Sequence, residues 1–248
     1  MKKALFLDID GVLQPCGEQE RFRHMNEIPD ICAHLNEKID TDFDYEAYAN
    51  YSYSNKCDIG AVYFDWDKDA VERLRRILDA TGARIVLSSD WREGGMGRMR
   101  GFLAIYGLDK YLEDATFCIL DSERHNLNDY TALNKKIEDW RNISQQIDKR
   151  MRELYPGDPN RWFDFVDSRT SEIREYLDRH PEITSFIALD DRNLTRGLDG
   201  HFIQTKNRIL EEYVEPAIEI LNREDGPFFF DESIHTPELE EWRRKYIK

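Results

Sequence analysis

The sequence has few cysteines, and they are widely spaced. Cys16, Cys32, Cys57 and Cys118 do not form the close pairs that are typical of zinc sites or of dense disulfide frameworks. The six histidines also show no metal-ligand spacing. We therefore expect reduced thiols in a cytoplasmic protein, and no zinc site.

Long apolar runs and an excess of basic charge are also missing. No run approaches the roughly 20 apolar residues that span a bilayer, and Met1-Lys2-Lys3 leads into a short β-type run instead of an export signal. We therefore expect no membrane partner. Fifty acidic against 35 basic residues give a net charge of −15, which repels polyanions at long range. Nucleic acid is thus a possible but disfavoured partner, and the sequence selects no oligomeric state.

The composition that is present is typical of a globular protein, with 40% hydrophobic and 34% charged residues. Short apolar runs alternate with amphipathic segments, which favours an α/β fold in three layers around a Rossmann-like parallel sheet of about five strands. The predicted strands are residues 3–8, 84–87, 115–120, 185–189 and 201–204, and the predicted helices are residues 67–81, 99–106, 128–154, 168–180 and 208–221.

We interpret residues 1–248 as a single domain whose core carries insertions. The first insertion is polar and aromatic with little periodicity, whereas the second holds a long helix whose apolar stripe suits packing or a dimer contact. The end of the chain is too apolar for a free tail, so we expect it to pack on the core. The core covers about 1–13, 66–120 and 168–221, the insertions about 14–65 and 121–167, and the C-terminal extension 222–248.

Polar residues directly follow three of the predicted strands. Ligands bind outside the carboxyl ends of the strands in open parallel sheets, so these side chains should converge on one site. Several carboxylates at one point repel each other unless a cation is present, and oxygen donors alone suit magnesium better than zinc. These residues are Asp8 with Asp10, Ser88 with Ser89, and Asp190 with Asp191.

The spacing of these groups suits the hydrolysis of a phosphate ester. Asp8 can attack phosphorus, and Asp10 can first donate a proton to the leaving oxygen and then take one from water. Gly11 gives the following turn the freedom to bring backbone amides near the transferring group. Ser88, preferred over Ser89, can bind a phosphate oxygen, and Arg169 can neutralise the charge that develops.

The stretch from Phe6 to Leu13, FLDIDGVL, resembles the first motif of the haloacid dehalogenase superfamily. Ser88 matches the second motif of that superfamily, and Asp190-Asp191 match the acidic fourth motif. The stretch from Ile85 to Arg92, followed later by Arg169 with Glu172-Ile173, resembles the domain found in multidomain RNA repair proteins and in stand-alone bacterial and phage proteins.

The resemblance implies that Asp8 is the nucleophile, Asp10 the acid/base and Asp191 a direct Mg²⁺ ligand. Asp190 would be a ligand or its support, and the backbone carbonyl of Asp10 would complete the protein's share of the metal shell. Arg169 stands where the superfamily usually has lysine, with Lys135 and Lys136 as alternatives. The two insertions take the places of the superfamily's caps, which choose substrates.

Structural alternatives stand beside each of these assignments. Asp-x-Asp-Gly alone could be a calcium loop or a turn, and Arg169 could form a surface ion pair with Glu172. Trp91 and Arg92 could line the pocket and bind substrate, or Trp91 could belong to the core. The tyrosines at 45, 48, 51 and 53 could stack a base or sugar, or pack a small cap.

The leading functional hypothesis is a magnesium-dependent phosphatase that acts on a small phosphorylated metabolite or nucleotide. A second hypothesis is a phosphatase that processes the 3′ or 5′ ends of RNA or DNA. A third is a non-catalytic binding module on the same core, which the presence of both Asp8 and Asp10 disfavours.

Overall fold

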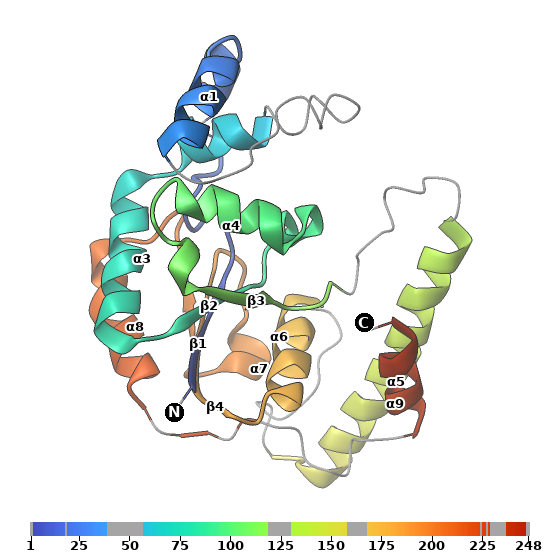
Figure 1. Ribbon diagram of the computed structural model, residues 1–248. Helices are drawn as coiled ribbons and strands as arrows, with labels where there is room; N and C mark the ends of the chain where they lie inside the picture. Colours follow the sequence, from blue (N-terminus) through green and yellow to red (C-terminus); the bar gives the residue numbers. More distant parts are fainter. Residues whose placement is uncertain are drawn as a thin grey trace.

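The computed structural model describes residues 2–17, 19–38, 57–118, 130–157, 168–223, 225–226, 228 and 237–246. Five strands form one sheet in which all neighbours run parallel, in the order β3-β2-β1-β4-β5 (Figure 1). The predicted α/β class with a parallel sheet is therefore confirmed. The strands are β1 (Lys2–Leu7), β2 (Arg84–Leu87), β3 (Leu112–Ala115), β4 (Ile183–Asp190) and β5 (Phe202–Gln204).

Helices cover both faces of the sheet and make the outer layers. Leu5 and Leu7 of β1 pack into a core with α3 (Lys68–Thr81), α4 (Met96–Ala104) and α8 (Val214–Leu221). Ala4 and Phe6 point to the opposite face, because successive side chains of a strand alternate. There they pack with α6 (Ser168–Arg179) and α7 (Thr195–Leu198). The central strand is thus buried on both sides, as its unbroken apolar sequence indicates.

Three elements have different bounds in the structure from those predicted from the sequence. The third strand ends at Ala115 instead of Leu120, because Phe117 leaves the sheet and packs on Trp140. Helix α8 begins at Val214 instead of Arg208, since Pro216 is tolerated only in a first turn. Helix α4 begins three residues before the predicted start and includes Gly97, whose low helix propensity the prediction followed.

The segment expected to lack periodicity, residues 14–65, contains helical structure in its described part. It holds α1 (Ile28–Lys38), the short helix η1 (Glu20–Arg23) and the π-helical turn η3 (Ala61–Asp65). η1 packs on η3, where the buried carboxylate of Asp65 accepts hydrogen bonds from Arg21. The helical turns of this segment lie at the end of the molecule opposite the start of β1 (Figure 1).

The long predicted helix of residues 128–154 is present as α5 (Tyr130–Leu154), which lies beside α9 (Pro237–Tyr246) (Figure 1). Trp140 and Trp242 are the centre of this contact. Arg243 of α9 also forms ion pairs with Glu175 and Asp178 of α6. The C-terminal segment therefore packs back as expected. Earlier in that segment, Phe228 contacts Phe186 and His201, whereas residues 229 and 230 lie outside the described part.

Within the described residues, no helix has both the length and the apolar composition that a membrane span requires.

Substitution of Asp67, the N-cap of α3, tests how the helix after the first insertion is fixed. Its side chain accepts a hydrogen bond from the Ala70 amide at 2.8 Å and pairs with Arg208 at 2.6 Å. Asp67→Ala should lower the free energy of unfolding by about 1–2 kcal/mol at neutral pH, as measured by urea denaturation. Asp69 is an exposed acid in the same turn, so Asp69→Ala should change the free energy of unfolding by less than about 0.5 kcal/mol.

The effect of Asp67 should also depend on pH. Burial acts to raise the pKa of Asp67, but the hydrogen bonds from the Ala70 amide and from Arg208 outweigh burial, and the pKa is lowered. A carboxylate with a lowered folded-state pKa stabilises the fold above its unfolded pKa and loses that contribution on acidification. The difference between wild type and Asp67→Ala should therefore shrink below about pH 4. A difference that stays constant down to pH 3 would contradict this assignment.

Candidate active site

Asp8 lies at the carboxyl end of the central strand. Its amide continues the sheet by bonding to the Leu189 carbonyl at 3.1 Å, so its backbone position is fixed by β1 and β4. The carboxylate is nearly buried, at 5% exposure, and accepts a hydrogen bond from the Ile9 amide at 2.9 Å. The predicted nucleophile is therefore held by the strand ladder and by the turn that follows.

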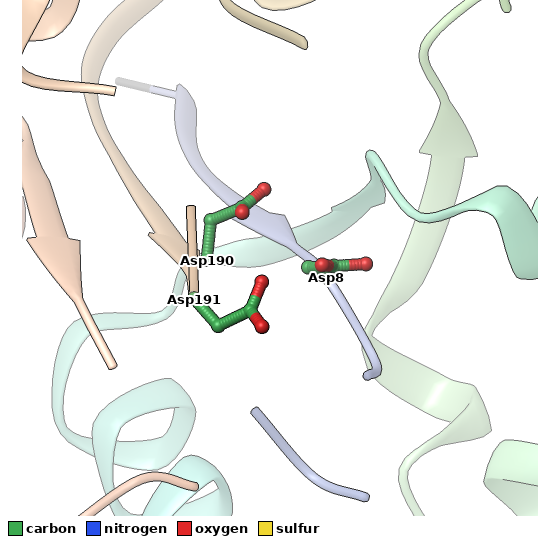
Figure 2. Close-up of side chains that lie close together, drawn as sticks. All are labelled: Asp8, Asp190 and Asp191. Carbon is green, nitrogen blue, oxygen red and sulfur yellow. The ribbon is translucent and has the colours of Figure 1, made fainter. Parts of the chain in front are cut away.

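Asp190 and Asp191 end the neighbouring strand, which brings them opposite Asp8. Leu7 pairs with Leu189 in the sheet, so the residues after each strand meet at the same edge. One carboxylate oxygen from each of the three aspartates lies within 4.8 Å of the others. Figure 2 shows the Asp191 carboxylate directed toward Asp8, with Asp190 beside it. The predicted convergence of these side chains is present.

Arg169, in the first turn of α6, places a positive charge against Asp8 and Asp190. Its Nη1 atom lies 3.2 Å from Asp8 Oδ1 and 3.1 Å from Asp190 Oδ2. Burial alone would lower the pKa of Arg169, but the carboxylates of Asp8 and Asp190 raise it. The alternative of a surface ion pair is wrong, because Arg169 is only 4% exposed.

The two alternative cations lie on α5. Lys135 pairs with Asp139 on that helix, and the side chain of Lys136 is outside the described part.

The remaining negative charge favours a cation at this edge of the sheet. Burial raises the pKa of Asp190, and the neighbouring Asp8 carboxylate adds to that effect. The same two causes raise the pKa of Asp191. A divalent ion between the carboxylates would offset both penalties, and oxygen ligands suit Mg²⁺.

Asp190 and Asp191 differ in how their carboxylates are used. One oxygen of Asp190 accepts from Arg169 and the other from the Arg192 amide, whereas Asp191 is half-buried. This arrangement favours Asp191 as the direct ligand and Asp190 as its support.

Gly11 allows the close approach of the turn after β1 to Asp191. Its φ angle is +73°, and a Cβ atom built there would lie 2.5 Å from Asp191 Cβ. Thr205 donates its hydroxyl to the Gly11 carbonyl at 2.7 Å and fixes the turn from the β5 side. The sequence signal for Gly11 was its place in the motif, whereas nothing in the local pattern indicated Thr205.

Asp10 is held by two hydrogen-bond donors from different segments. Trp91 Nε1 donates to its Oδ2 at 3.0 Å, and Gln14 Nε2 donates to its Oδ1 at 2.9 Å. Burial raises the pKa of Asp10, and the bond from Trp91 lowers it, with a net upward shift. Gln14 was not among the predicted site residues, since no side-chain pattern distinguishes it from the rest of the insertion.

Ser88 and Ser89 differ in what their hydroxyls contact. Ser88 is 1% exposed, and its Oγ has no hydrogen-bond partner among the described residues. Ser89 Oγ instead accepts from the Trp91 amide at 3.4 Å and caps the short helix η4 (Asp90–Gly94). A buried hydroxyl without a partner is costly unless a ligand satisfies it, so the geometry favours Ser88 as the phosphate-binding serine.

Arg92 connects the loop after β2 to the helix that carries Arg169. Its Nη2 lies 2.6 Å from Glu172 Oε2, and its Nη1 donates to the Ser89 carbonyl at 2.8 Å. Both side chains of the Arg92–Glu172 pair are buried, at 5% and 3% exposure. This pair holds α6 against the second-motif loop. Direct contact of Arg92 with substrate stays a prediction.

The tyrosines at 45, 48, 51 and 53, proposed to stack a base or sugar or to pack a small cap, lie outside the described residues.

Comparison with known families agrees with this geometry. The sequence model for the HAD domain in Swiss Army Knife RNA repair proteins matches residues 4–210. The chain belongs to this HAD family. Membership indicates a phosphatase-like hydrolase domain, and HAD domains typically use a divalent metal. The comparisons with curated proteins and with solved structures found no match.

Gly11→Ala tests the close approach to Asp191. The substitution should lower the free energy of unfolding, measured by urea denaturation, for two reasons. The left-handed backbone conformation costs about 1–2 kcal/mol with a Cβ atom, and overpacking against Asp191 costs about 1–3 kcal/mol more. Gly17→Ala is the matched control, because Gly17 also has a positive φ but a Cβ there would meet nothing within 4 Å. Equal losses in the two variants would show that Asp191 does not constrain this turn.

Glu172→Gln tests the buried ion pair with Arg92. It leaves the Arg92 charge buried without its counter-charge, so unfolding should become easier by about 3–5 kcal/mol. Glu72→Gln removes the acid of an exposed pair with Arg75 on α3 and should cost less than about 0.5 kcal/mol. A loss in Glu172→Gln no larger than in the control would refute the structural role of the pair.

Proposed function

We propose that the protein is a magnesium-dependent phosphatase that hydrolyses phosphomonoesters through an aspartyl-phosphate on Asp8. The observation that carries the proposal is the meeting of Asp8, Asp190 and Asp191 at one edge of the sheet, with ligand atoms within 4.8 Å of one another. Arg169 belongs to the same edge, as does the Ser88 hydroxyl, which has no hydrogen-bond partner within the described part of the chain. Family membership supports the reaction class.

The donors available here are all oxygen atoms, which suits Mg²⁺. Asp8 and Asp191 would hold the ion through carboxylate oxygens, with the main-chain carbonyl of Asp10 as a further ligand and Asp190 as their support. When bound, the ion supplies positive charge that offsets the carboxylates and orients a phosphate group. Mg²⁺ commonly takes only one or two protein carboxylates, which leaves room for substrate oxygens.

The protein's own residues divide the chemistry between them. Asp8 attacks phosphorus while Asp10 gives a proton to the leaving oxygen, and water then cleaves the aspartyl-phosphate with Asp10 as base. Ser88 donates its hydroxyl to a phosphate oxygen. Arg169 offsets the charge on the transferring group, and its contacts to Asp8 and Asp190 keep it in place.

A small phosphorylated metabolite or nucleotide is our preferred substrate class, because the net charge of −15 opposes a polyanion. The second candidate is the phosphorylated end of a nucleic acid. It is favoured by one observation, that the matching family is described from RNA repair proteins. A binding module without catalysis is disfavoured because both carboxylates of the first motif are present and ordered by hydrogen bonds.

The first test is release of inorganic phosphate from nucleotides, sugar phosphates, aryl phosphates and 3′- or 5′-phosphorylated oligonucleotides. Wild type should be active with Mg²⁺ and inactive with EDTA, and Asp8→Asn should lose at least about a thousandfold in kcat because the nucleophile is gone. Asp69→Asn, an exposed acid on α3, serves as the matched control and should keep full activity.

The preferred compound decides between the two substrate classes. If wild type releases no phosphate from any compound, or if Asp8→Asn matches wild type, the proposed function is wrong.

A further inference from the structure

Trp91 reaches Asp10 from a segment far along the chain. It lies in η4, directly after the second-motif loop, whereas Asp10 lies in the turn after β1. The indole Nε1 donates to Asp10 Oδ2 at 3.0 Å. This bond joins the predicted acid/base to the loop that carries Ser88, so the Asp10 carboxylate and this loop are held in a fixed position relative to each other.

The indole of Trp91 is itself held by two buried aromatic rings. Trp66 lies 6.0 Å away and Phe102 5.9 Å away between ring centroids, both in edge-to-face geometry. Trp66 and Phe102 are each 2% exposed, so neither ring can move aside without disturbing the core. The indole donor to Asp10 Oδ2 is therefore held in place by buried rings, and the other carboxylate oxygen accepts from Gln14.

We propose that Trp91 is a positioning residue that orients the Asp10 carboxylate for proton transfer to the leaving group. The proposal rests on the phosphatase function proposed above and replaces a direct contact of Trp91 with substrate. The indole N–H can only donate a hydrogen bond. Because Oδ2 must accept this bond, the other oxygen, Oδ1, remains to carry the proton.

Bond making and proton transfer occur together in the first half of the reaction. The Asp8 carboxylate forms a bond to phosphorus, the bond from phosphorus to the leaving oxygen breaks, and the proton on Asp10 Oδ1 moves to that oxygen. In the structure Gln14 Nε2 donates a hydrogen bond to Oδ1, and the leaving oxygen replaces Gln14 at this position in the reaction. In the second half, water returns a proton to Oδ1 while its oxygen attacks phosphorus, which releases Asp8 and inorganic phosphate.

Trp91→Phe tests this role through its dependence on the leaving group. Phenyl phosphate and p-nitrophenyl phosphate have similar shapes, but phenol is the weaker acid, so its departure depends more on a proton donor. The substitution keeps an aromatic ring and removes the N–H. We expect kcat/KM for phenyl phosphate to fall by about 10- to 100-fold, and for p-nitrophenyl phosphate by less than about threefold.

Trp66→Phe is the matched control. It removes a buried indole N–H from the same aromatic group, and this N–H has no hydrogen-bond partner among the described residues. We expect equal, small changes in kcat/KM for both aryl phosphates. Urea denaturation of both variants shows whether the fold is kept.

A second measurement separates positioning from general damage. If Trp91 acts through Asp10, then Trp91→Phe should change kcat/KM no further in an Asp10→Asn background, whereas independent effects would multiply. An equal fall for both aryl phosphates in Trp91→Phe, or a full additional loss in the double variant, would overturn the proposal. If wild type hydrolyses no phosphate compound at all, the phosphatase function itself fails, which is a different result.

Discussion

The structure depends on one electrostatic constraint, the meeting of Asp8, Asp190 and Asp191 at the ends of two adjacent parallel strands. Their mutual repulsion at low exposure would destabilise the fold if nothing offset it. Arg169 supplies part of the offset from the start of α6, with its guanidinium between Asp8 and Asp190. The negative charge that remains is the physical reason why this edge of the sheet suits a divalent cation.

A second set of contacts holds the parts of the site in fixed positions relative to one another. The buried Arg92–Glu172 pair joins the loop after β2 to α6, and the Trp91–Asp10 bond joins the same loop to the turn after β1. Asp8 and Ser88 are fixed by the strand ladder itself, because their backbone amides donate hydrogen bonds to the carbonyls of Leu189 and Leu7, respectively. The loop after β2 therefore supports both α6 and the turn after β1, on either side of Asp8.

The sequence predicted the sheet and the acids because those features are local. An apolar run that ends in Asp8 or Asp190 carries its own signal, and parallel pairing brings the ends together. The displaced elements depend on distant partners instead. Phe117 lies outside the sheet, partly buried against Trp140 and Trp242. Gln14 and Thr205 matter because the fold places them against Asp10 and Gly11. Such long-range contacts produce no periodic pattern in the sequence from which they could be predicted.

The position of Asp8 on the central strand has a further consequence for how the protein folds. Its neighbours on the sheet are β2 (Arg84–Leu87) and β4 (Ile183–Asp190), so β1 is paired on both edges only after β4, much further along the chain, has joined the sheet. Contacts between such distant segments are slow to form, because a long loop must close before they contribute stability. The meeting of Asp8 with Asp190 and Asp191 is therefore expected late in folding, after the local contacts of the helices have formed.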